Sequence, residues 1–186
     1  MSHFYSNITL RGVGSENVLA CLKEHGDIAY VSPAMKDAVV VFHEDLAGQE
    51  ELAARLSLRL GCPALLAMVY GQSILLYQLY QSGRQIDAYV SSPHDDLELE
   101  HPAPPGDAAI LCAAFQAERF ERRVETILRK VTKPDQPYAY AINRHGELAR
   151  ALGLPLIAAG AGFEAIEMGE LPQAPGFDSR LLIRTK

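Results

Sequence analysis

Residues 73–90 read SILLYQLYQSGRQIDAYV, and this stretch constrains the architecture more than any other. Two runs of aliphatic and tyrosine residues flank the turn Gln81–Gly83, a pattern typical of a β-hairpin. Strand alternation puts apolar side chains on both faces of the first run: Leu75, Tyr77 and Leu79 on one face, and Ile74, Leu76 and Tyr80 on the other. Because water cannot lie against either face, we expect other elements to sandwich the hairpin.

The N-terminal half alternates strand and helix patterns. Four strands are expected, at Phe4–Arg11, Ile28–Val31, Ala38–His43 and Ala64–Tyr70. Two helices are expected between them, one capped by Ser15 and stopped by Gly26, the other capped by Asp45 and ended by Gly61 and Pro63. The order βαββαβ predicts an α+β fold with a ferredoxin-like sheet, which the hairpin then extends.

The C-terminal half supplies the expected cover for the sheet. Residues 93–106 form an acidic, proline-rich connector, and helical apolar spacing begins at Asp107. We expect further elements in the order helix Asn143–Leu152, short strand Phe163–Met168 and edge strand Leu181–Arg184. The interpretation is a single domain over residues 1–186, with a sheet-forming half (1–92), the connector (93–106) and a mainly helical half (107–186).

Charge and composition exclude several classes of function. The chain has 17 Lys and Arg against 23 Asp and Glu, a net charge of −6, whereas nucleic-acid binding normally requires a basic surface. Its longest apolar runs, such as Pro63–Tyr70, fall short of the ~20 residues that cross a bilayer. Three widely spaced cysteines and a start without signal-peptide features favour buried, reduced thiols in the cytoplasm, with no membrane partner.

Cofactor and catalytic motifs are weak. The Gly12-Val13-Gly14-Ser15 turn lacks the third small residue of a dinucleotide fingerprint, and Gly160–Ala165 matches by letters but is soon followed by Gly169 and Pro172. His94, Asp95, Asp96 and His101 could ligate a metal, but they lie in the connector, where a solvated acidic loop is the simpler interpretation. We therefore expect no cofactor, no metal and no assigned catalytic residue.

Tyrosines and acids suggest a binding surface. Aromatic surface beside acidic charge suits a basic protein partner, because charge steers the partner and tyrosine anchors it. The predicted partner-binding residues are Tyr77, Tyr80, Asp87 and Tyr89 of the hairpin, with Asp95, Asp96, Glu98 and Glu100 of the connector. The simpler alternative is that the tyrosines pack the sheet against the C-terminal helices.

Four segments resemble parts of small uncharacterised bacterial proteins: Phe4–Gly12, Ala29–Pro33, Ala151–Pro155 and Gly162–Pro172. The resemblance spans most of the chain but rests on structural motifs. It implies a bacterial, cytosolic, free-standing protein and no particular activity.

The leading hypothesis is a non-catalytic protein-binding protein, in its narrower form a bacterial immunity protein that neutralises a basic cognate toxin. One alternative is a regulatory domain that binds a small molecule or anion at Gly12, Gly14 and Ser15, where free amides begin a helix. Another alternative is an enzyme whose type the motifs do not reveal.

Overall fold

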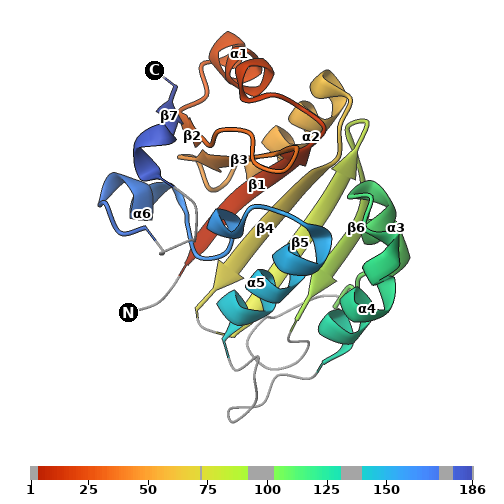
Figure 1. Cartoon of the computed structure of the whole chain (residues 1–186). Helices are drawn as coiled ribbons and strands as arrows, with labels where there is room; N and C mark the ends of the chain where they lie inside the picture. The colour runs from red at the N-terminus through yellow and green to blue at the C-terminus, as the bar shows by residue number, and fades with distance from the viewer. Residues whose placement is uncertain (1–3, 72, 92–102, 131–139, 172–177, 186) are drawn as a thin grey trace.

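The computed structural model describes residues 4–71, 73–91, 103–130, 140–171 and 178–185 (Figure 1). These residues build one antiparallel sheet with the strand order β6-β5-β4-β1-β3-β2-β7. The strands are β1 (Tyr5–Arg11), β2 (Ala29–Val31), β3 (Ala38–His43), β4 (Ala64–Tyr70), β5 (Ile74–Gln81), β6 (Arg84–Val90) and β7 (Ile183–Arg184).

The β5–β6 hairpin extends the sheet at β4, as the sequence predicts. Leu65 pairs with Leu79 across β4 and β5, and Tyr77 pairs with Tyr89 across β5 and β6. A register shift at Leu79 and Tyr80 interrupts the second ladder near the turn. At the opposite end of the sheet β7 pairs with β2, so residues from both ends of the chain share one sheet.

Helices lie on both sides of the sheet. They are α1 (Ser15–His25), α2 (Gln49–Leu60), α3 (Ala108–Ala114), α4 (Glu121–Arg129), α5 (Ala141–Leu152) and α6 (Phe163–Glu167), with the 3-10 turns η1 (Glu118–Phe120), η2 (Leu156–Ala158) and η3 (Ser179–Leu181). Helix α2 ends where Gly61 takes a left-handed backbone conformation, φ +63°, which glycine adopts without strain.

Helices α1 and α2 cover the first face. Leu22 and Leu56, one from each helix, are fully buried against Ile8, Val41 and Leu66 of the sheet. Removing a leucine of this size from water contributes roughly 1.5–3 kcal/mol to folding. This face also receives Tyr80, which is 6% exposed.

Helices α3, α4 and α5 cover the second face at its β4–β6 end; Figure 1 shows α5 lying across β4 and β5, with α3 and α4 beside β6. Leu75 and Leu79 of β5 belong to the same buried cluster as Phe115, Val124 and Leu148 of the C-terminal half. The two halves therefore share this cluster, and both faces of the hairpin strand β5 are covered. Farther along the face, Val40 and Phe42 pack against Ile157 and Phe163.

Three local predictions are wrong. Residues expected as the strand Phe163–Met168 form helix α6 instead, where the Met168 amide donates to the Glu164 carbonyl at 3.0 Å. Ser15 is the first residue of α1 rather than its cap, which is Gly14. Asp45 accepts from the Ala47 amide in a turn that precedes α2, and Gly48 caps that helix.

No helix in the described part of the chain is long and apolar enough to span a bilayer. Cys21, Cys62 and Cys112 are buried free thiols. Burial raises the pKa of Cys62 and Cys112 to about 11, so both thiols are neutral near pH 7.

Candidate functional site

The hairpin tyrosines lie inside the protein, so the predicted aromatic surface patch is wrong. Tyr77 is 1%, Tyr89 2% and Tyr80 6% exposed. Tyr77 and Tyr89 stack at 5.3 Å between ring centroids beneath α3 and α4, whereas Tyr80 points to the α1–α2 face. The C-terminal helices cover the face that the first two rings occupy, which leaves neither ring available to a partner.

Each buried hydroxyl has a partner in the protein. Tyr77 donates to the Asp87 carboxylate at 2.7 Å, and Tyr80 donates to the Gln78 side chain at 2.7 Å. Tyr89 donates to the Leu128 carbonyl at 3.0 Å and accepts from the Arg144 guanidinium at 3.1 Å. The Tyr77 bond joins β5 to β6 and the Tyr89 bonds join β6 to α4 and α5, whereas the Tyr80 bond stays within β5.

Burial raises the pKa of Tyr77 well above its usual value, and the nearby Asp87 charge adds to that rise. Burial and the Glu50 charge raise the pKa of Tyr80 to about 12. Both hydroxyls are therefore protonated donors at neutral pH. Burial also raises the pKa of Asp87, while hydrogen bonds from Tyr77 and the Asp107 amide oppose that rise.

Asp87 is half-buried and anchors the end of the connector. The Asp107 amide donates to the Asp87 carboxylate at 3.1 Å, next to the bond from Tyr77. One step earlier, the Val90 amide donates to the Pro104 carbonyl at 3.0 Å. Asp87 thus ties β6 to the first residue before α3 and has a positioning role.

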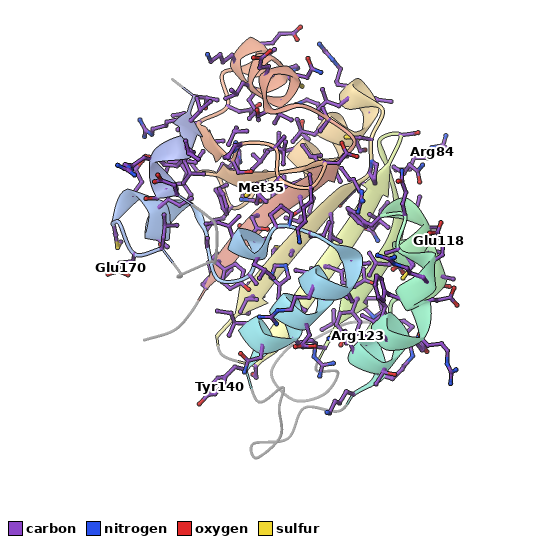
Figure 2. All side chains as sticks on the ribbon, in the orientation of Figure 1. Met35, Arg84, Glu118, Arg123, Tyr140 and Glu170 are labelled. Atoms are coloured by element: carbon purple, nitrogen blue, oxygen red, sulfur yellow. The ribbon has the colours of Figure 1, made fainter. Side chains whose placement is uncertain are left out.

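The connector acids Asp95, Asp96, Glu98 and Glu100 lie outside the described residues, so their part in binding stays a prediction. Tyr140 is half exposed at the start of α5 and points away from the sheet (Figure 2).

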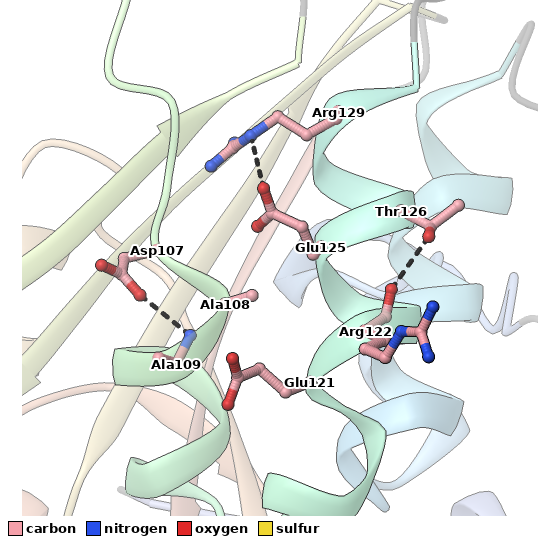
Figure 3. A pocket seen from close by; sticks show the side chains of 8 residues that line it. All are labelled: Asp107, Ala108, Ala109, Glu121, Arg122, Glu125, Thr126 and Arg129. Carbon is pink, nitrogen blue, oxygen red and sulfur yellow. Dashed lines mark hydrogen bonds and ion pairs between the residues drawn. The ribbon is translucent and has the colours of Figure 1, made fainter.

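An open groove lies between α3 and α4, where the connector enters the helical half (Figure 3). Its volume is about 500 Å³. Its lining residues are Asp107, Ala108, Ala109, Glu121, Arg122, Glu125, Thr126 and Arg129. Three carboxylates and two guanidinium groups therefore line the groove, which leaves it one negative charge in excess.

Most of these charges already have a role in the fold. Asp107 caps α3 by accepting from the Ala109 amide at 2.8 Å and the Ile110 amide at 3.1 Å. Arg129 donates to the Pro105 and Gly106 carbonyls and pairs with Glu125 at 2.9 Å. These contacts fix the walls of the groove.

Glu121 is different. Within the described residues its exposed carboxylate makes no hydrogen bond and no ion pair, and in Figure 3 it points into the space between α3 and α4. The Arg122 guanidinium points away from it in the same view. Glu121 is thus the acid in the groove that is available to a cationic group, with Asp107 and Glu125 on either side.

Two i,i+4 pairs of opposite charge in the sequence, Glu118–Arg122 and Glu125–Arg129, predict a solvated outer face, but neither pair singles out Asp107 or Glu121. The Glu125–Arg129 pair is confirmed. Glu121 and Glu125 share one side of α4 because they are four residues apart, and that spacing was the available signal. The facing wall could not be recognised, because it depends on how α3 packs against α4.

The alternative ligand site is a tight turn. Gly12 has φ +78° and its amide donates to the Asp37 carbonyl at 2.8 Å, while Gly14 caps α1. Glu16 places a carboxylate in the first turn of α1, where an anion would otherwise bind. No feature of this turn in the described residues therefore supports anion binding at Gly12, Gly14 and Ser15.

We compared the chain with protein-family models, with curated proteins and with solved structures, and none of the three comparisons found a match.

Proposed function

We propose that this chain is a non-catalytic protein-binding protein, and that its partner presents lysine or arginine side chains to the groove between α3 and α4. The observation that carries the proposal is the Glu121 carboxylate, which points into that groove without a partner among the described residues. Carboxylates are the natural partners of ammonium and guanidinium groups, and a guanidinium can be bound in a bidentate manner.

Charge over the whole chain supports a basic partner. The net charge is −6, and the connector that leads into the groove carries Asp95, Asp96, Glu98 and Glu100. Such a distribution accelerates encounter with a basic protein and lowers association with acidic ones. In this proposal the connector acids steer the partner, and the groove receives one of its basic side chains.

In this proposal the hairpin supports the groove through its buried contacts. Tyr77 holds Asp87, and Asp87 holds the Asp107 amide at the rim of the groove. The buried tyrosine therefore positions the groove wall, which replaces the anchoring role expected from the sequence.

The narrower proposal is a bacterial immunity protein acting on a basic toxin in the cytoplasm. The free buried thiols support a reducing compartment. We further infer that residues of β1–β4 with α1 and α2 form a ferredoxin-like unit. The strand order β4-β1-β3-β2 and the position of both helices on one face support that inference.

The test uses an eight-residue arginine peptide carrying a fluorescent label, with binding measured by anisotropy at low and high salt. We expect Glu121→Gln to weaken binding about 2- to 5-fold at low salt, which is the range for one exposed charge pair. Glu16→Gln, an exposed acid on α1, is the matched control and should leave affinity unchanged. Equal affinities for all three proteins would reject the groove as the binding site.

A further inference from the structure

A buried imidazole joins α5 to the sheet. His145 of α5 is 2% exposed, and the Tyr5 hydroxyl of β1 lies 2.9 Å from its Nδ1 atom. The two rings also stack, with centroids 5.9 Å apart and planes 12° from parallel. In the tautomer protonated at Nε2, the neutral imidazole accepts the Tyr5 proton at Nδ1.

The same strand holds the segment that follows α5. Asn7, fully buried, donates to the Ala158 carbonyl at 2.7 Å and to the Ala161 carbonyl at 2.9 Å. Side chains of Tyr5 and Asn7 point to the same face because they are two positions apart. Strand β1 thus binds both α5 and residues 156–162 through a short row of polar groups.

The charged groups on the elements around His145 have other partners. On α5 itself, Arg144 donates to the Ile127 and Lys130 carbonyls, and Glu147 pairs with Arg123 of α4 at 2.8 Å. On β5, Tyr77 binds Asp87. On η2, residues 156–158 are all apolar.

We propose that the Tyr5–His145 contact is an acid-sensitive latch, and that a proton added to His145 releases α5 and residues 156–162 from β1 while the α1–α2 face stays folded. An imidazolium cannot accept the Tyr5 proton at Nδ1, and burial deprives its charge of water. The inference is independent of the binding role of the groove.

The titration behaviour supports this direction. Burial alone lowers the pKa of His145 from 6.5 to about 4, with no charged group contributing to the shift. When α5 is released from β1, His145 meets water and binds a proton more tightly than when α5 is packed. The packed state therefore loses stability as pH falls below 6.5, and the loss levels off near pH 4. Between pH 7.5 and 4.5 these two values predict a roughly 70-fold rise in the opening equilibrium.

Amide hydrogen exchange measured by NMR on the full chain tests the latch. Protection factors of Leu148 and Leu152 should fall roughly 70-fold between pH 7.5 and 4.5, whereas those of Val39 and Val41 in β3 should change far less. In His145→Asn, whose side-chain oxygen can accept the Tyr5 hydroxyl, the difference between the two regions should disappear.

Two further variants keep the test decisive. His25→Asn changes an exposed histidine of α1 and should behave like wild type. Tyr5→Phe removes the hydroxyl whose proton only the neutral imidazole accepts, so it should open more at pH 7.5 and show a smaller pH ratio than the wild-type chain. An equal loss of protection in β3 and α5, or no loss below pH 5 in the wild-type chain, would overturn the latch.

Discussion

The contact between Tyr77 and Asp87 gives the sharpest test of how the hairpin supports the groove. Tyr77 is 1% exposed, and the acceptor of its hydroxyl is the Asp87 carboxylate at 2.7 Å. Asp87→Ala leaves that hydroxyl buried without its acceptor, which costs about 1–3 kcal/mol. Asp87→Asn retains an acceptor oxygen at the same place. It also removes a partly buried charge, and burial of the carboxyl group raises the pKa of Asp87. The loss of stability in Asp87→Asn should therefore be much smaller than in Asp87→Ala.

Urea unfolding at pH 7, followed by circular dichroism, measures both changes. With a denaturant slope of roughly 2 kcal/mol per molar urea, Asp87→Ala should lower the midpoint by about 0.5–1.5 M. Tyr77→Phe combined with Asp87→Ala removes the unpaired hydroxyl and should recover part of the loss. Equal midpoints for Asp87→Ala and Asp87→Asn would refute the reasoning, because the acceptor oxygen would then contribute nothing.

Two other substitutions, with a control variant elsewhere in the chain, probe the same region. Gly106 has φ +69°, and a methyl group there would meet the Tyr77 hydroxyl at 2.6 Å, so Gly106→Ala should destabilise the fold by about 2–3 kcal/mol in urea unfolding. Gly12→Ala, at φ +78° with no atom within 4 Å of the new methyl, should cost only about 1 kcal/mol and serves as its control. Arg144→Lys keeps the charge but loses the planar donor group that binds Tyr89, the Ile127 carbonyl of α4 and the Lys130 carbonyl just after it. Thermal unfolding should show a loss of about 2–4 kcal/mol, and an unchanged melting temperature would contradict that role.

Local patterns predicted much of the sheet. The alternation in residues 73–90 gave the hairpin and its two apolar faces, and Leu75 and Tyr80 lie on opposite faces as expected. Alternation determines which face a side chain occupies, but not what covers that face. The sequence therefore could not predict that α3, α4 and α5 cover Tyr77 and Tyr89, or that α1 and α2 cover Tyr80.

Other errors arose from short segments and distant contacts. In Phe163–Met168 the apolar pattern is too short to separate strand from helix, and packing of Phe163 against Phe42 occurs with a helical backbone. His145 lies in a segment whose helix was expected, but its contact with Tyr5 joins residues 140 positions apart, which no local pattern reveals. The groove could not be predicted for the same reason, since its two walls come from separate helices.

The central claim is that the groove beside Glu121 receives a basic side chain. The most direct measurement is a chemical-shift titration of the isotope-labelled protein with N-acetyl-arginine amide, read at every backbone amide. We predict that the largest shifts fall on Ala109, Glu121 and Thr126, and that Glu121→Gln reduces them. Shifts scattered over other acidic surfaces, with those three amides unmoved, would contradict the proposed binding site.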